Sequence, residues 1–185
     1  MAIRAFARAG VARAVSVPED LVRLVTAAQR QDRAAFAELY ALYARTVHGI
    51  LLSRVPRADV DDLLQDVFLR AMQRLPELRD PAAFSGWLAT IARNCATDYF
   101  RHAAPTAELP DDVPAHDSDR VEALAVMGII RTLPEAYRET LTLRLVEGLT
   151  GPEISARTGL TEGSVRVNLH RGMKQLRERL ERRPV

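Results

Sequence analysis

The sequence predicts an all-α protein made of two small helical bundles, which a flexible, acidic, proline-containing linker joins. Apolar residues recur at helical spacing in residues 19–102 and again in residues 119–183. Between these blocks, residues 103–118 contain three prolines and four acidic residues, with neither lysine nor arginine. No stretch of the sequence shows the period-two alternation of a half-buried strand.

Composition narrows the class of protein. The chain has 185 residues, of which 48% are hydrophobic and 27% charged, a mix typical of a soluble globular protein with one large or two small domains. No apolar run approaches the roughly 20 residues that span a bilayer, and we expect a cytoplasmic location. Cys95 is the only cysteine and the four histidines are scattered, so we expect no disulfide, no metal and no other cofactor.

Residues 1–18 form an extension before the first block. It carries Arg4, Arg8 and Arg13 and no acidic residue, a pattern that organelle transit peptides also show. We interpret it as an N-terminal extension outside the two bundles. It lacks the apolar stretch of a secretory signal, so we do not expect export.

Four helices are expected in the first block. Asp32 stands where an N-cap is needed before the second helix. Proline ends helices, and Pro76 and Pro81 bracket a loop before the fourth. The expected helices run from Glu19 to Gln31, from Asp32 through Val47, from about Ala58 to Leu75, and from about Phe84 to His102.

The second block carries the pattern of a helix-turn-helix. Thr150 and Glu153 have the spacing of a capping box. A short helix is expected from there to Thr158, followed by a tight turn that contains Gly159. A long helix then begins near Thr161, and this order of elements is the helix-turn-helix arrangement.

The long helix has one apolar side and one basic side. The apolar side comprises Val165, Leu169, Met173, Leu176 and Leu180. A solvated helix face normally mixes charge signs, whereas the opposite side of this helix is basic from Arg166 to Arg177. We interpret it as a DNA-contacting face. Its residues are Arg166, His170 and Arg171, which would face the major groove, and Lys174 and Arg177, which would reach phosphates.

The third expected helix carries an apolar residue on its polar side. Leu69 falls among residues that include Asp62, Gln65 and Asp66. An apolar residue framed by acids suggests a protein-docking surface, although single exposed leucines are also common. The carboxylates of Asp62 and Asp66 also fit a metal site in an enzyme, but no histidine, third carboxylate or phosphate-binding loop accompanies them.

The fourth expected helix also has two distinct faces. Its apolar stripe includes Cys95, which we interpret as a small buried filler rather than a nucleophile. The other face is polar and modestly basic, and it suits either solvent or single-stranded nucleic acid, whose bases stack on aromatic rings and pair with amides. This face carries Thr90, Arg93, Asn94, Thr97 and Arg101.

Taken together, these segments resemble a bacterial RNA polymerase sigma factor of the extracytoplasmic-function (ECF) group. Residues 59–75, DVDDLLQDVFLRAMQRL, and residues 84–102, FSGWLATIARNCATDYFRH, resemble the family's second conserved region. Residues 133–180, which begin LPEAYRETL, resemble its fourth. The two motifs stand in the family's order with an acidic linker between them, and the resemblance covers nearly all of residues 19–182.

The resemblance implies a role for each of three groups of residues. Those implied to dock on the clamp helices of the polymerase's largest subunit are Asp62, Gln65, Asp66 and Leu69. Those implied to capture the unwound −10 strand are Glu77, Leu78, Arg79, Asp80, Arg93, Asn94, Thr97 and Arg101, with Asn94 lining a pocket for a flipped base. Those implied to read the −35 duplex are Arg166, Val167, His170, Arg171 and Lys174.

The resemblance also implies partners and a domain layout. Region 2 would occupy residues 19–102 and region 4 residues 119–183, with linker 103–118 directed toward the polymerase's active cleft and RNA exit path. The partners would be core polymerase, through its clamp helices and flap, promoter DNA, and an inhibitory anti-sigma factor.

The sequence departs from the family's usual pattern in the second block. Gly151-Pro152 stands where the family has an aromatic residue followed by an acid. The recognition stretch reads RVNLHRG, where many members begin with lysine-serine-arginine and end with alanine. Val167 and Asn168 therefore leave the base preference open. Gly172 is expected to cost the helix about 1 kcal/mol relative to alanine.

We therefore expect a dissociable polymerase subunit that recognises and melts promoters, with no catalysis of its own. One alternative is an autonomous helix-turn-helix transcriptional regulator, which would need no polymerase and would leave the first block without a role. The other is an enzyme, such as a metal-dependent nuclease built around Asp62 and Asp66.

Overall fold

The protein is described by a computed structural model of residues 19–102 and 118–182. The expected extension 1–18 and nearly all of the expected linker lie outside these residues. Within them every regular element is helical, which confirms the all-α prediction. The elements of the first block are α1 (Glu19–Gln29), α2 (Arg33–Leu52), η2 (Arg57–Asp59), α3 (Val60–Arg74), η3 (Leu75–Glu77), η4 (Pro81–Ala83) and α4 (Phe84–His102).

The second block contains four helices. It begins one residue earlier than expected, because Ser118 already belongs to the first of them. Leu133-Pro134 and Gly148-Leu149-Thr150 separate helices, as the sequence predicts. The elements are α5 (Ser118–Arg131), α6 (Glu135–Leu145), α7 (Gly151–Thr158) and α8 (Glu162–Glu181).

The chain reverses between α1 and α2 at the predicted cap. The Asp32 carboxylate accepts hydrogen bonds from the backbone N–H groups of Ala34, at 2.9 Å, and Ala35, at 3.2 Å. These bonds satisfy donors that the first turn of a helix leaves free. The first helix ends at Gln29, two residues before the predicted end, because Gln31 adopts a left-handed φ of 67° that a helix cannot continue through.

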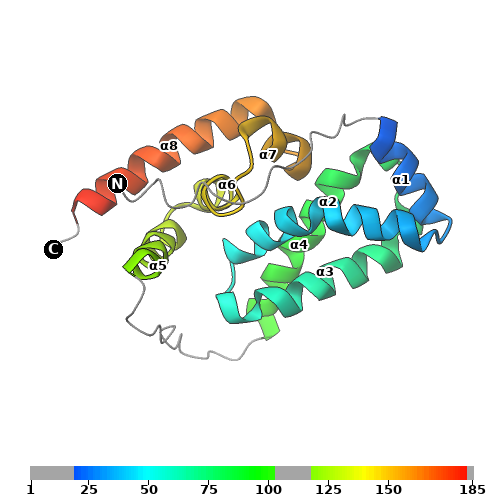
Figure 1. Cartoon of the computed structure of the whole chain (residues 1–185), viewed down its shortest axis with the longest axis horizontal. Helices are drawn as coiled ribbons and strands as arrows, with labels where there is room; N and C mark the ends of the chain where they lie inside the picture. The colour runs from blue at the N-terminus through cyan, green and yellow to red at the C-terminus, as the bar shows by residue number, and fades with distance from the viewer. Residues whose placement is uncertain (1–18, 103–117, 183–185) are drawn as a thin grey trace.

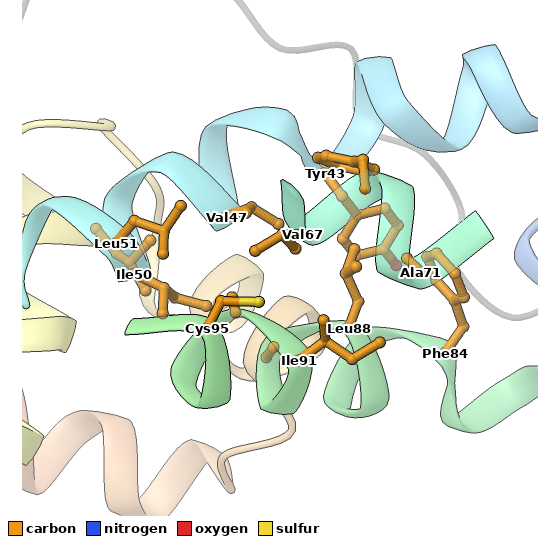
Figure 2. Packing of buried hydrophobic residues seen from close by; sticks show 14 of the residues in the cluster. Tyr43, Val47, Ile50, Leu51, Val67, Ala71, Phe84, Leu88, Ile91 and Cys95 are labelled. Carbon is orange, nitrogen blue, oxygen red and sulfur yellow. The ribbon is translucent and has the colours of Figure 1, made fainter. Parts of the chain in front are cut away.

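The core of the first block lies between α2, α3 and α4. Figure 2 shows Val47 of α2, Val67 of α3 and Leu88 of α4 meeting in its centre. Tyr43 is buried there too, and a 2.6 Å hydrogen bond to Ser85 of α4 satisfies its hydroxyl. Cys95 is fully buried in this core, as predicted for a filler, and burial raises the pKa of its thiol.

A smaller core holds α5, α6 and α8 together. It is formed by Ile130, Leu133, Leu141 and Leu176. Here α6 and α8 approach closely at Gly172, where a Cβ atom would lie 3.0 Å from Leu141 Cδ1 and 3.1 Å from Tyr137 Cβ. The glycine that costs helix propensity is therefore compensated by close packing of the two helices.

The two blocks pack against each other through α2 and α4 of the first (Figure 1). Helix α6 lies on α2, and α7 lies on α4. Leu143, Leu149, Ile154 and Val165 of the second block join the buried cluster of the first, so one hydrophobic core spans both. The sequence predicts the two blocks but not this shared core.

The packing at Gly172 predicts opposite effects for two glycine-to-leucine substitutions. Gly172→Leu should lower the free energy of unfolding by about 1–3 kcal/mol, because the added atoms overpack the contact between α6 and α8. Gly128→Leu is the control, since a Cβ at this exposed α5 position meets nothing within 4 Å. It should stabilise the protein by up to about 1 kcal/mol through helix propensity. Urea unfolding of both variants measures the difference, and equal effects would contradict the packing argument.

Candidate nucleic-acid and protein interfaces

The predicted helix-turn-helix is formed by α7 and α8. Thr150 and Glu153 make the full capping box: the Thr150 backbone N–H donates to Glu153 Oε2 at 2.8 Å, and Thr150 Oγ1 accepts from the Glu153 backbone N–H. The bonds from Thr150 lower the pKa of the Glu153 carboxyl. Gly159 ends α7 with a left-handed φ of 76°, and Thr161 caps α8 through a 3.1 Å bond from the Ser164 N–H.

The basic side of α8 is exposed along its length. Val165 and Leu176 on the opposite side are buried, as the helical spacing predicts. Val167 lies among the basic residues with 41% of its surface exposed, so this face has an apolar contact point as well as charges. The residues of this face that line a shallow hollow are Arg166, Val167, His170 and Arg171. Lys174 continues the exposed face one turn further along.

The predicted docking side of α3 is exposed as well. Asp62, Gln65 and Asp66 all lie in solvent. Leu69 is 57% exposed and its neighbour Met72 58%, although both are large and apolar. An apolar pair bordered by carboxylates is the composition expected of a protein-binding patch. Among residues 19–102 and 118–182, no group of three or more histidine, cysteine or acidic side chains is placed to hold a metal ion.

The backbone of the loop before α4 is anchored by Gln29, which no pattern in the sequence identifies. Gln29 at the end of α1 donates its side-chain N–H groups to the carbonyls of Leu75, at 3.1 Å, and Leu78, at 2.8 Å. Asp80 caps the following turn by accepting from the Ala82 N–H at 3.0 Å. Leu78 is half-buried, whereas Glu77, Arg79 and Asp80 are exposed. The loop therefore presents mainly polar side chains from a fixed backbone.

Of the four α4 residues implied to contact the −10 strand, three are exposed and the fourth, Arg93, is bound to other residues. Asn94, Thr97 and Arg101 face solvent. The Thr97 hydroxyl donates to the Arg93 carbonyl at 3.0 Å, and Arg101 pairs with Asp98 at 2.8 Å. Only Asn94 of these three has no side-chain bond among the described residues.

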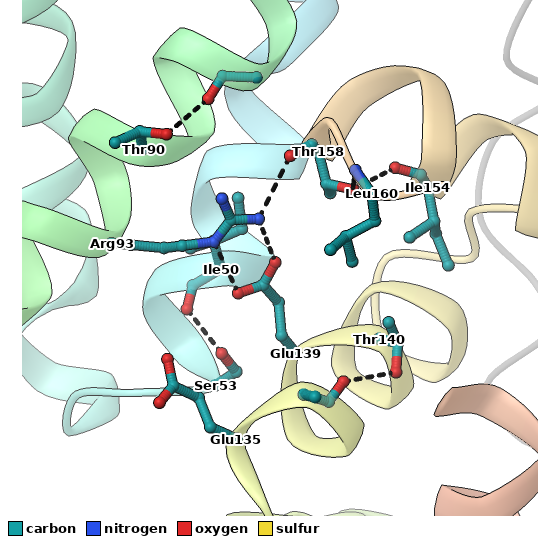
Figure 3. Close-up of polar contacts among 12 residues, drawn as sticks. Ile50, Ser53, Thr90, Arg93, Glu135, Glu139, Thr140, Ile154, Thr158 and Leu160 are labelled. Atoms are coloured by element: carbon teal, nitrogen blue, oxygen red, sulfur yellow. Dashed lines mark hydrogen bonds and ion pairs between the residues drawn. The ribbon is translucent and has the colours of Figure 1, made fainter. Parts of the chain in front are cut away.

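Arg93 instead binds the second block (Figure 3). Its Nε donates to Glu139 Oε2 at 3.1 Å and its Nη2 to Glu139 Oε1 at 2.7 Å, a two-point contact with the carboxylate. The same Nη2 lies 3.3 Å from the carbonyl oxygen of Thr158, at the end of α7. The structure thus separates Arg93 from the exposed residues of its predicted group.

Glu139 is the centre of the contact between the blocks. It is only 4% exposed, and Arg54, in the turn after α2, also donates to its Oε2, at 2.6 Å. Burial by itself would raise the pKa of this carboxyl, but the bonds and charges of Arg93 and Arg54 outweigh burial and lower it. Arg54 also pairs with Glu135 at the start of α6.

A second ionic cluster joins the blocks at Glu147, after the end of α6. His48 Nδ1 lies 2.7 Å from Glu147 Oε1, and Arg45 Nε lies 3.5 Å from Oε2. The hydrogen bond to Glu147 raises the pKa of His48 against the opposing effect of burial, with Asp61 adding to the rise and Arg57 reducing it.

Comparison with known proteins matches both blocks. The family model of sigma-70 region 2 matches residues 39–106, and that of sigma-70 region 4 matches residues 123–176. Together these matches cover more than half of the chain and follow the order that the resemblance predicts. The chain belongs to the sigma-70 family of RNA polymerase sigma factors.

Curated relatives place it in the ECF group. It is 34% identical to RNA polymerase sigma factor CarQ of Myxococcus xanthus over 160 residues, which cover 79% of this chain and 89% of CarQ. It is 29% identical to the ECF RNA polymerase sigma-E factor of Escherichia coli K12 over 177 residues, which cover 85% of this chain and 93% of that protein.

A solved structure shares the fold. CnrH, in its complex with the cytosolic domain of CnrY, matches with a TM-score of 0.63 and 25% identity, covering 88% of this chain and 98% of CnrH. As an ECF sigma factor, this chain directs promoter recognition and transcription initiation by RNA polymerase. In a sigma factor the first block has a role, whereas an autonomous regulator would leave it without one. No helix in the described part of the chain is long and apolar enough to cross a membrane.

The His48–Glu147 contact predicts how stability depends on pH. Because the folded-state pKa of His48 is raised, the stabilisation from this pair is complete below the ordinary value of about 6.5 and is lost as the pH rises through the folded-state pKa. Urea unfolding at several pH values should show this loss in the wild type and not in His48→Gln. Parallel pH profiles for the two proteins would contradict the assignment.

Proposed function

We propose that three exposed surfaces divide the work of initiation: α3 docks on core polymerase, the loop before α4 and the polar face of α4 capture the unwound −10 strand, and α8 reads the −35 duplex. The observation that carries this proposal is the placement of three chemically different faces on three helices of one sigma factor.

The α3 face suits a protein partner. Leu69 and Met72 expose apolar surface that water solvates poorly, while Asp62 and Asp66 beside them supply charge. Burial of the apolar pair would contribute affinity, and the carboxylates would favour a basic partner surface and fix its register. The polymerase clamp helices are the partner that the family assignment supplies, and Gln65 completes the face.

The −10 surface combines a fixed loop with an amide. Asn94 presents both a donor and acceptors, which suits the edge of an unstacked base. Glu77, Arg79 and Asp80 are exposed on a loop whose backbone Gln29 anchors, so their positions are set before DNA binds. Capture of an unwound strand at this surface would favour the melted promoter over the closed duplex.

The −35 surface suits duplex DNA. Arg166, His170 and Arg171 are donors that can reach base edges from a helix in the major groove, and Val167 can contact a thymine methyl group. Lys174, further along, would contact phosphate. The cap at Thr161 and the capping box of α7 fix the start of this helix, which is the end that reads bases in helix-turn-helix proteins.

The location of the protein, its lack of catalysis and its further partners follow from the same role. The protein acts in the cytoplasm as a binding subunit without catalysis or cofactor, and the flap of the polymerase is a second contact for region 4. CnrH was solved with the cytosolic domain of CnrY bound, which supports a protein partner for this chain too, and we assign that role to an anti-sigma factor.

Run-off transcription tests the whole proposal. Bacterial core polymerase would be mixed with fragmented genomic DNA, with and without this protein. Discrete transcripts that depend on the protein are expected, and their start sites would define both promoter elements. Core binding without any transcript would contradict promoter recognition by the polymerase-bound protein, and absence of core binding would contradict the role of α3.

Reversal of one charge tests the α3 face. Asp66→Arg should weaken binding to core polymerase about tenfold or more, because it places a cation on a face proposed to meet a basic surface. Glu38→Arg, the same reversal at an exposed position of α2, is the control and should bind as the wild type does. If Asp66→Arg captures core enzyme as well as the wild type does, Asp66 is not part of the interface.

Two substitutions on α8 separate base reading from phosphate contact. Arg171→Ala should lower transcription from promoters with a −35 element by the equivalent of about 1–3 kcal/mol and relax specificity at one base position. Lys174→Ala should weaken binding to all DNA sequences alike and reduce the salt dependence of that binding. The measurement is transcription across a set of −35 variants, and an unchanged sequence profile for Arg171→Ala would reject its role in base reading.

A further inference from the structure

The turn between α1 and α2 is an exposed basic segment to which the proposed function gives no role. This basic turn comprises residues 30–33, Arg-Gln-Asp-Arg, and all four are exposed. Within residues 19–102 and 118–182, Gln31 is the only residue other than glycine with a positive φ, at 67°. Residues with a Cβ rarely adopt this conformation, and where they do they are often part of a functional site.

The hydrogen bonds of the basic turn explain its backbone but not its side chain. The Gln31 N–H donates to the Ala28 carbonyl at 3.0 Å, and the Asp32 N–H donates to the Ala27 carbonyl at 3.2 Å. These two bonds form a Schellman motif, in which glycine usually occupies the left-handed position. Glycine at residue 31 would end α1 in the same way with less backbone strain. The exposed amide of Gln31 therefore needs a reason outside the turn.

The charges around the basic turn leave cations available to a ligand. Asp32 and Asp80 accept hydrogen bonds from backbone N–H groups, and Glu77 lies 3.8 Å from Arg74. Three exposed arginines, in contrast, form no ion pair within the described part of the chain. They are Arg30, Arg33 and Arg79. A ligand that uses these groups must be anionic.

The basic turn is fixed beside the loop that is proposed to capture the −10 strand. Gln29, directly before the turn, donates its side-chain amide to the carbonyls of Leu75, at 3.1 Å, and Leu78, at 2.8 Å. Because Arg30 follows Gln29 and Arg79 follows Leu78, these bonds bring the backbones of the two arginines close together. Figure 1 shows the turn and the C-terminal end of α3 at the same end of the first block. The basic turn therefore continues the proposed −10 surface.

We propose that Arg30, Gln31 and Arg33 bind the phosphodiester backbone of the unwound strand, beyond the bases that the loop before α4 captures. This inference rests on the proposed −10 function. Guanidinium groups donate pairs of hydrogen bonds to phosphate oxygens, and the amide of Gln31 adds a neutral donor. Contacts of this kind hold a strand in position without reading its sequence.

The salt dependence of strand binding tests the two arginines. Holoenzyme formed from core polymerase and the full chain is titrated with a labelled single strand of a promoter mapped by run-off transcription, and with a scrambled strand. The logarithm of the affinity falls linearly with the logarithm of the salt concentration, with a slope of about 0.7 for each phosphate contacted on a single strand. Arg30→Gln and Arg33→Gln should each reduce the slope by about 0.7, and the double variant by about 1.4, alike for both strands.

Arg57→Gln is the matched control for these substitutions. Arg57 is also exposed, but it lies on η2, beyond the opposite end of α2 from the basic turn. It removes the same charge from the same block, so it measures the general effect of net charge on DNA binding. The slope for Arg57→Gln should equal that of the wild type.

Substitution of Gln31 separates a role in binding from a role in folding. Gln31→Gly should raise the urea midpoint of unfolding, because glycine adopts the left-handed conformation without strain. It should also weaken strand binding about two- to tenfold, because the amide is lost. Gln31→Asn keeps an amide in a residue that tolerates this conformation, and should retain most of the affinity. A glycine variant that is more stable but binds like the wild type would overturn the role of Gln31.

The same titrations distinguish failure of the backbone site from failure of the −10 function. Wild-type holoenzyme that does not prefer the promoter strand to the scrambled strand would overturn the proposed −10 function, and this inference with it. If the preference is present but the arginine variants keep the wild-type slope, only the phosphate contacts of the basic turn are overturned. A loss confined to the promoter strand would indicate base reading, and a loss confined to duplex DNA would indicate contact outside the unwound region. Either result would overturn a backbone site for the unwound strand.

Discussion

The buried carboxylate of Glu139 constrains how the whole molecule is arranged. A carboxylate that is 4% exposed needs charged partners, and both come from the other block: Arg54 in the turn after α2 and Arg93 on α4. This three-residue contact fixes α6 against α4 and against the end of α2. Two close approaches lie in the same interface: Leu143 packs on Gly49, and Gly159 packs on Gly86. Removal of the carboxylate would leave two arginines facing each other.

The same arrangement keeps two of the three proposed surfaces available. In Figure 1, α3 lies on the side of the first block away from α6, α7 and α8, so its exposed Leu69 and Met72 remain open to a partner. The basic side of α8 also points away from the shared core. Only the α4 face is partly covered. Each surface alone is small, and attachment of both blocks to one polymerase would supply the effective concentration that makes two weak DNA contacts specific.

Much of the fold follows from sequence patterns whose residues lie within about four positions of each other. The Asp32 cap, the capping box of Thr150 and Glu153 and the left-handed turn at Gly159 all form where the sequence predicts them. The exposure of Leu69 and the burial of Cys95 follow from helical spacing in the same way. Helix α1 ends two residues before the predicted end, because nothing in the sequence pattern predicts the left-handed backbone of Gln31.

The sequence by itself determined the helices, the helix-turn-helix and the family, since all of these depend on local spacing and on motifs that stand in order along the chain. Only the tertiary structure decided the state of Arg93, which periodicity places on a solvent-facing stripe beside Asn94. Its partner Glu139 lies 46 residues away, and Gln29 lies 49 residues from the Leu78 carbonyl that it anchors. Such pairs depend on how helices pack in space, and helical periodicity specifies which side of a helix is apolar but not which charge will face it.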